Sequence, residues 1–176
     1  LPPSAQKALE RIYRRRVPLD SIATPELVRS LAEASHECRR QVGALVHRSG
    51  QVDYVVVGSP SGLMLPYIGR LRAAQGRFRA LRLVHTHLFN EELSRDDLVD
   101  LVRLRLDAVA AVMLTKEGDP RAVHYAYNVP IAADARATLG GSTADGGRSE
   151  PYHMVGPVLP HKLDGDFASL IRGLED

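Results

Sequence analysis

The chain has 176 residues, of which 44% are hydrophobic, and a formal net charge of +2. This length and apolar content predict one globular domain with an ordinary core. The single cysteine, Cys38, excludes an intramolecular disulfide and is typical of a reducing compartment, so we expect a cytoplasmic protein. No apolar run approaches the roughly 20 residues that a membrane-spanning helix needs.

Two helices are expected first. Ser4 is a candidate N-cap for a helix over 4–16, in which apolar residues recur at helical spacing. Thr24 is a stronger N-cap, because a proline and then a glutamate follow it in the first turn. The second helix is predicted to run to about residue 40.

Strands follow the helices. The segments 42–46 and 52–57 are rich in valine, and Arg48-Ser49-Gly50 between them predicts a hairpin turn. A short strand is expected over 63–65. The segment 66–79, rich in glycine and arginine, is expected to be irregular.

The middle of the chain predicts a βαβ unit. A buried strand is expected over 80–86, a helix that Ser94 starts over 95–105, and strands over 108–114 and 122–127. The apolar residues of the helix that we expect to face inward are Leu98, Leu101, Val102 and Leu104 or Leu106.

These elements predict an α/β fold, a mixed β-sheet with helices packed on it. We assign residues 1–130 to this domain, with its N-terminal helices. From Leu139 to Gly147 the sequence is rich in glycine, serine and threonine, so 131–163 is assigned to a flexible linker. Residues 164–176 are assigned to a C-terminal helix, about 164–174.

The sequence has no nucleotide-binding motif. A phosphate-binding P-loop ends in Gly-Lys-Ser or Gly-Lys-Thr, and none of the three lysines follows a glycine. The chain therefore does not bind GTP in that way, and no catalytic residue is assigned to it.

The strongest chemical motif is His85-Thr86-His87, followed by Ser94 and Asp97. Residues i and i+2 of a strand project from one face, so both imidazoles can enter one site. Asp97 can add a carboxylate oxygen from the first turn of the next helix. Two histidines and one carboxylate are the ligand set of a catalytic zinc site with an open position for water.

A second interpretation needs no metal. Ser94 and Asp97 have the spacing of a capping box, in which the hydroxyl and the carboxylate satisfy backbone N–H groups at a helix start. The two histidines can then be satisfied by hydrogen bonds at the strand end.

The His-x-His and Ser-x-x-Asp pattern resembles the JAMM/MPN metalloproteases, whose three-layer fold is also deaminase-like. The resemblance implies zinc at His85, His87 and Asp97, and contact of Ser94 with the water or intermediate. Two features depart from the family. The spacer between His87 and Ser94 has six residues instead of seven, and Gln41 stands where the family has its glutamate base. An amide cannot accept that proton. No sequence feature places Glu37, Glu91 or Glu92 as its replacement.

Arginines are candidates for RNA or phosphate contact, because the planar guanidinium binds phosphate in a bidentate manner. Of 23 basic residues, 20 are arginine, and two clusters stand out. The first cluster is Arg11, Arg14, Arg15 and Arg16, and the second is Arg70, Arg72, Arg77, Arg79 and Arg82. The candidates for contact are Arg14, Arg15, Arg16, Arg70, Arg72, Arg77 and Arg79.

An ordered series of short segments resembles the N-terminal extension of long bacterial HflX-type GTPases, over about residues 4–130. The segments are Arg14–Pro18, Thr24–Leu27, Arg40–Gly43, Leu65-Pro66, Gly69-Arg70, Leu81–Leu88 and Arg95–Leu98.

This resemblance implies an accessory domain of a ribosome-associated GTPase. Its expected partners are the large ribosomal subunit and its own downstream GTPase domain, which alone would bind GTP and Mg. Three hypotheses stay open: a non-catalytic ribosome-binding module, a JAMM-like zinc hydrolase, and an inactive relative of that hydrolase whose cleft binds protein.

Overall fold

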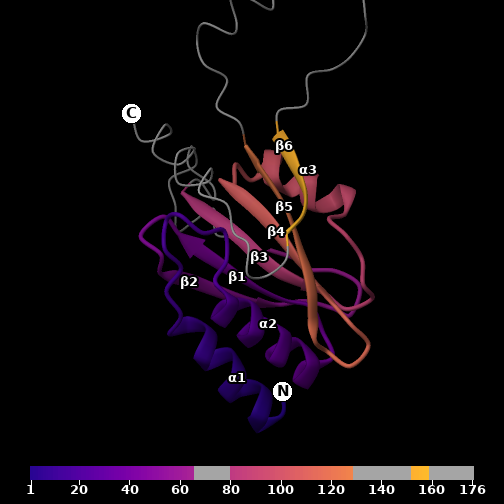
Figure 1. Ribbon diagram of the computed structural model, residues 1–176. Helices are drawn as coiled ribbons and strands as arrows, with labels where there is room; N and C mark the ends of the chain where they lie inside the picture. The colour runs from indigo at the N-terminus through magenta and orange to yellow at the C-terminus, as the bar shows by residue number, and fades with distance from the viewer. Residues whose placement is uncertain (66–79, 129–151, 159–176) are drawn as a thin grey trace, which may run out of the picture.

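The computed structural model describes residues 1–65, 80–128 and 152–158, which form a sheet with helices on both of its faces (Figure 1). The six strands of this part are ordered β2-β1-β3-β4-β5-β6. β3 and β4 are parallel, and every other neighbouring pair is antiparallel. The predicted α/β class, with a mixed sheet and packed helices, is confirmed.

The elements alternate much as the sequence predicts. In chain order they are α1 (Pro3–Tyr13), α2 (Pro25–Cys38), β1 (Val42–His47), β2 (Val52–Val57), β3 (Leu81–His87), α3 (Arg95–Arg103), β4 (Ala108–Leu114), β5 (Pro120–Asn128) and β6 (Tyr152–Val158).

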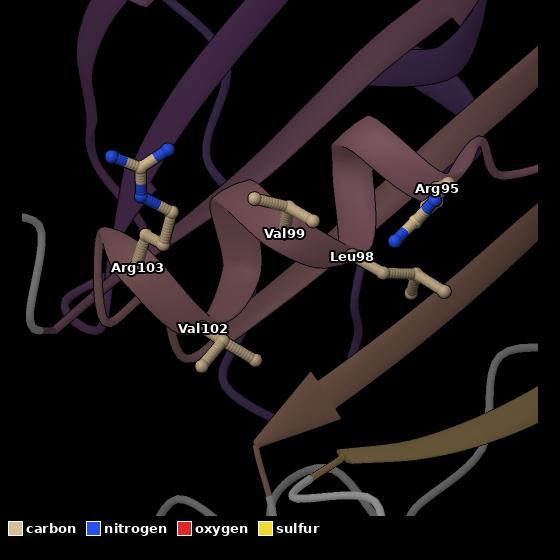
Figure 2. A pocket seen from close by; sticks show the side chains of 5 residues that line it. All are labelled: Arg95, Leu98, Val99, Val102 and Arg103. Carbon is tan, nitrogen blue, oxygen red and sulfur yellow. The ribbon is translucent and has the colours of Figure 1, made fainter.

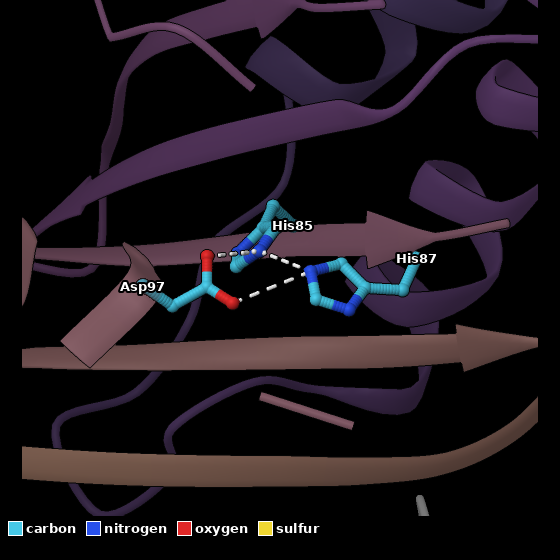
Figure 3. Close-up of side chains that lie close together, drawn as sticks. All are labelled: His85, His87 and Asp97. Atoms are coloured by element: carbon cyan, nitrogen blue, oxygen red, sulfur yellow. Dashed lines mark hydrogen bonds and ion pairs between the residues drawn. The ribbon is translucent and has the colours of Figure 1, made fainter. Parts of the chain in front are cut away.

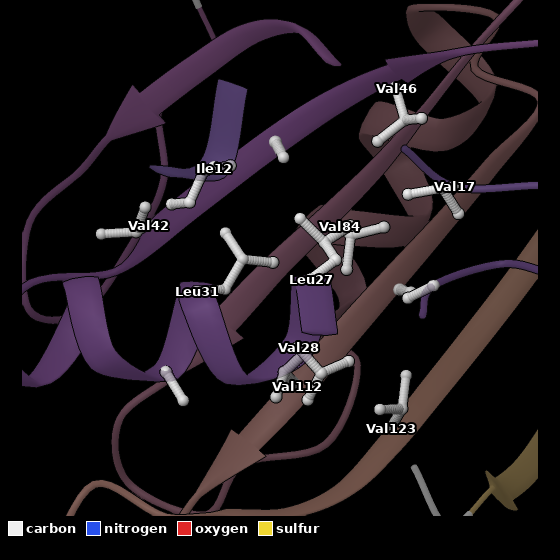
Figure 4. Packing of buried hydrophobic residues seen from close by; sticks show 14 of the residues in the cluster. Ile12, Val17, Leu27, Val28, Leu31, Val42, Val46, Val84, Val112 and Val123 are labelled. Atoms are coloured by element: carbon white, nitrogen blue, oxygen red, sulfur yellow. The ribbon is translucent and has the colours of Figure 1, made fainter. Parts of the chain in front are cut away.

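α1 and α2 cover one face of the sheet, and this layer contains the larger core. Leu27 and Leu31 of α2 point at Val84 of β3 and its neighbours on β1 and β4 (Figure 4). Thr24 caps α2 by accepting a hydrogen bond from the Leu27 amide, as predicted. This layer holds β3 from behind and leaves its opposite face to α3.

α3 covers the other face, together with a smaller core of leucines. Leu101 is buried against Leu81 and Leu83 of β3, and Leu106 joins the same cluster. Arg105 has a φ of 58°, and the Leu106 amide donates to the Leu101 carbonyl, so the chain turns back at once into β4. The predicted βαβ unit is therefore confirmed as β3–α3–β4.

Three local expectations are wrong. α1 begins at Pro3 after an extended Pro2, and the Ser4 hydroxyl instead donates to the Glu37 carboxylate at 2.7 Å. Residues 63–65 form no strand, because a bridge between Ser59 and Gly62 closes a turn just before them. Val102 faces solvent with 38% exposure, since Leu101 and Leu106 fill the inner face.

β6 has no counterpart in the sequence prediction. It pairs with β5 inside the range 131–163 that was assigned to a linker. The predicted irregular segment 66–79 and the C-terminal helix 164–174 lie outside the described residues.

None of the described helices combines the length and the apolar character needed to cross a bilayer.

Candidate metal centre

β3 delivers both histidines to one site at its C-terminal end. His85 and His87 lie on the α3 side of the strand, like Leu81 and Leu83, because alternate residues share a face. They are only 1% and 3% exposed. Their Nε2 atoms approach each other to 2.9 Å (Figure 3).

Asp97 reaches the same point from the first turn of α3. Its Oδ1 lies 3.0 Å from Nε2 of His85, and its Oδ2 lies 3.4 Å from Nε2 of His87. The three residues predicted as metal ligands are therefore brought together, and they form one potential ligand group of the described residues.

The capping box is also present, so the two interpretations of Asp97 hold at once. Oδ2 of Asp97 accepts hydrogen bonds from the amide and the hydroxyl of Ser94, both at 2.7 Å, and the Asp97 amide donates to the Ser94 hydroxyl oxygen. These bonds fix the carboxylate and leave Oδ1 facing His85. Capping thus orients the ligand instead of competing with it.

The size of the site fits a small divalent cation. Ligand atoms about 2.1 Å from a tetrahedral zinc ion lie about 3.4 Å from one another. The two Nε2 atoms lie 2.9 Å apart, and the carboxylate approaches them to 3.0 Å through Oδ1 and to 3.4 Å through Oδ2, so the group is of this size or slightly tighter. Two imidazole nitrogens and a carboxylate oxygen are also a donor set that zinc accepts.

The tautomer of His87 fits the same interpretation. Its Nδ1 lies 3.1 Å from the Glu91 carbonyl oxygen, which can only accept, so Nδ1 carries the proton. In the neutral ring Nε2 then keeps its lone pair, directed at His85 and Asp97. Such a backbone contact is the usual support of a histidine ligand.

His85 lacks this support among the described residues. Its Nδ1 is buried and has no hydrogen-bond partner there. If Nε2 of His85 binds a cation, Nδ1 carries the proton and its hydrogen bond remains unmade.

The charges in the site favour a carboxylate anion beside a cation. Burial acts to raise the pKa of Asp97, but hydrogen bonds from His85, His87 and Ser94 outweigh it and hold that pKa well below its usual range. Burial acts to lower the pKa of His87, but Asp97 and the nearby backbone carbonyls outweigh it and raise that pKa. A metal would replace the proton that otherwise neutralises this carboxylate.

Gln41 lies beside the candidate ligands. The β1–β3 register pairs Gly43 with His85, and continuing it puts the buried Gln41 opposite His87, on the same face. The Gln41 backbone amide donates to the Ser59 carbonyl, and the Gln41 carbonyl accepts from the Gly58 amide. An amide therefore occupies the position next to the ligands that the JAMM resemblance assigns to a base.

The three candidate replacement bases do not join the ligand group of the described residues. Glu37 lies on α2 and binds Ser4, on the opposite face of the sheet. The Glu92 carboxylate lies 3.9 Å from Nδ1 of His124, and Glu91 contacts His87 through its backbone carbonyl.

Gly43 lies beside the candidate ligands, although no sequence motif marks it. A Cβ at this position would lie 2.6 Å from a methyl carbon of Leu63 and 3.1 Å from Cβ of His85. Glycine thus lets Leu63 pack over the strand beside the ligands. The available signal was a glycine inside a valine-rich strand, which often marks a close approach.

The arginines are divided by the fold. Arg14 and Arg16 are exposed after α1, and Arg15 donates to the Ser30 hydroxyl at 2.9 Å. The other four candidates, Arg70, Arg72, Arg77 and Arg79, lie outside the described residues.

Arg82 is not a surface arginine. It is 2% exposed, and its guanidinium donates to the carbonyls of Ile22, Val17 and Pro18. It anchors the α1–α2 connection to the sheet.

Comparison with protein-family models gives no match to this chain, and comparison with curated proteins gives no significant relative.

Proposed function

We propose that this domain binds one divalent transition metal, zinc by its donor set, at His85, His87 and Asp97, and acts as a non-hydrolytic accessory module. The observation that carries the proposal is the convergence of the two Nε2 atoms and the carboxylate within 3.4 Å. Imidazole nitrogens and carboxylate oxygens are ligands that zinc accepts in proteins.

The chain's own residues argue against turnover. A zinc hydrolase needs a general base beside the metal-bound water, whose pKa the metal lowers. Gln41 cannot accept a proton, and the Ser94 hydroxyl is bound to the Asp97 carboxylate. The site therefore supports metal retention and a fixed surface better than hydrolysis.

Zinc content tests the metal proposal directly. We expect elemental analysis and calorimetric titration of the chain to give one equivalent, and H85A and H87A to lose it. H36A, an exposed histidine on the opposite face, is the matched control and should retain it. Less than about a tenth of an equivalent, with no gain on adding zinc, would refute a site of this ligand set.

The hydrolase alternative has a separate test. We expect the wild-type chain to release no product from peptide or isopeptide substrates with zinc bound. Q41E restores the carboxylate that the resemblance requires and is the variant in which activity should appear first. Metal-dependent turnover by the wild type, abolished in D97N, would replace the accessory proposal with an enzymatic one.

The second candidate function is contact with the large ribosomal subunit as part of an HflX-type GTPase. It is supported by the ordered series of matching segments and by the exposed Arg14 and Arg16 beside α1. Phosphate contacts weaken as salt rises. We therefore expect co-sedimentation with large subunits at low salt, and its loss in R14E/R16E.

R29E, an exposed arginine on α2, is the control for this measurement. If wild type and R14E/R16E sediment alike, or if neither binds at low salt, these arginines are not a ribosome contact. That result would leave the zinc proposal unaffected, because the metal site lies on the other side of the sheet.

A further inference from the structure

The loop between β3 and α3 carries the backbone carbonyl that supports His87. Glu91 in this loop places its carbonyl oxygen 3.1 Å from Nδ1 of His87. The loop has little anchorage of its own, since residues 89–92 are all exposed and even the apolar Phe89 has 65% exposure. Exposed loops with few buried side chains move readily. The Glu91 carbonyl is therefore a fixed partner for His87 only if the loop is held in place.

β5 holds this loop at two points. The Arg121 guanidinium donates to Oδ1 of Asn90 at 3.1 Å, and the Glu92 carboxylate lies 3.9 Å from Nδ1 of His124. Asn90 and Glu92 are the neighbours of Glu91 in the chain, so the two contacts act on the segment that presents the carbonyl. We call the two β5 residues, Arg121 and His124, the β5 clamp.

The register of the sheet explains how the β5 clamp reaches the metal centre. β4 lies between β3 and β5, and β5 begins at the edge of the sheet where the parallel strands β3 and β4 end. His85 pairs with Ala111, and Ala111 pairs with His124, so both histidines lie on the α3 side of the sheet. Two strand spacings, about 10 Å, separate β3 from β5. The loop therefore crosses the end of β4 to connect the candidate ligands with β5.

These contacts are poorly explained as elements of stability. Arg121 and Asn90 are both exposed, and the Glu92 side chain has 73% exposure. Exposed polar and ionic pairs contribute little to the free energy of unfolding. What the two contacts do fix is the position of the loop carbonyl next to His87.

We propose that Arg121 and His124 are positioning residues of the metal centre. They fix the loop so that the Glu91 carbonyl keeps the His87 proton on Nδ1 and leaves Nε2 available to the cation. The effect on metal binding rests on the proposed function, whereas the effect on the His87 ring is a property of the metal-free chain as well. Loss of a contact that orients a metal ligand typically lowers metal affinity 10- to 100-fold.

A pair of double variants with unchanged net charge tests the proposal. R121M/E92Q removes both contacts and one charge of each sign. R95M/E91Q removes the same charges but keeps both contacts, because Arg95 lines a hollow on the outer side of α3 (Figure 2) and Glu91 acts through its backbone. We expect calorimetric titration to show about tenfold weaker zinc binding in R121M/E92Q and wild-type binding in R95M/E91Q. R121K should bind zinc like the wild type, since a lysine N–H can donate to Asn90.

Nitrogen-15 NMR of the imidazole rings detects the same role without zinc. In zinc-free protein, at a pH where the ring is neutral, we expect wild-type His87 to carry its proton on Nδ1. In R121M/E92Q the two tautomers should mix, so the shifts of the two ring nitrogens should move towards each other, and R95M/E91Q should keep the wild-type spectrum. A wild-type chain that takes up no zinc would refute the proposed function, but these spectra would still decide the positioning role. Unchanged His87 spectra in R121M/E92Q, or equal affinities of the two double variants for zinc, would overturn it.

Discussion

The two faces of β3 use polar residues in opposite ways. On the α1–α2 face, Arg82 and Thr86 are buried, and each is matched by nearby partners: backbone carbonyls for Arg82, and Ser35 and the Val42 backbone for Thr86. On the α3 face, His85 and His87 meet each other and Asp97 at separations that suit a cation. Burial of a polar group therefore does not by itself mark a functional site; the convergence of lone pairs does.

The largest expected effect is a loss of stability on the α1–α2 face of β3, where Arg82 is buried. R82M leaves the carbonyls of Ile22, Val17 and Pro18 without their buried donor, and should lower the free energy of unfolding by about 3 kcal/mol or more. Urea denaturation measures this. R16M, at an exposed position, should change it by less than about 0.5 kcal/mol. Equal effects of the two variants would mean that the contacts of Arg82 add little to stability.

The next effect is the stabilisation that zinc should give on the α3 face of β3. Zinc at about 100 times its Kd should raise the unfolding free energy by about 2.7 kcal/mol. D97N should lose most of this gain, whereas D96N, in the same helix turn, should keep it. Melting curves with and without zinc give the comparison, and a full zinc effect in D97N would exclude Asp97 as a ligand.

Variants of Ser94 test whether this residue only orients Asp97 or itself binds the metal. S94A removes the cap of α3 and should cost about 1 kcal/mol of stability without metal. Because the hydroxyl only orients Asp97, zinc affinity should fall about tenfold, without disappearing. S94T should restore both quantities. Complete loss of binding in S94A, measured by calorimetry, would instead make the hydroxyl part of the coordination sphere.

The smallest expected effect is a pH dependence of the metal-free protein. The pKa of His87 is raised in the folded state, so protonation of His87 stabilises the fold below the unfolded pKa of about 6.5. This contribution is lost as the pH rises through the raised folded value. Chelator-treated protein should therefore lose stability over that interval, and H87Q should flatten the profile. A slope that is unchanged in H87Q would assign the titration to another group.

Much of this contrast was predictable from sequence, because alternation along a strand and capping chemistry are local. The segment around His85 and His87, the cap at Thr24 and the paired strands 42–46 and 52–57 all lie within a few residues of their predicted bounds. The convergence of His85, His87 and Asp97 was predictable for the same reason: a strand end and the next helix start are close in the chain.

The features that the sequence did not predict depend on contacts between residues far apart in the chain. Arg82 looks like a surface arginine until the carbonyls of Val17 and Ile22, 65 and 60 positions away in the chain, are placed around it. Gly43 matters only because Leu63 packs against it. β6 contains a glycine and a proline, which weaken a strand pattern, and its pairing with β5 is not encoded locally.

The shared carboxylate of Asp97 has a consequence for regulation. One side chain both caps α3 and belongs to the proposed cation site. If a cation binds there, metal binding and formation of the first turn of α3 are coupled, and by reciprocity each favours the other to the same extent. Whatever rigidifies α3 from its outer surface should tighten metal binding. Loss of the metal should in turn loosen the first turn of that helix, so that α3 reports the state of the site at the surface of the molecule.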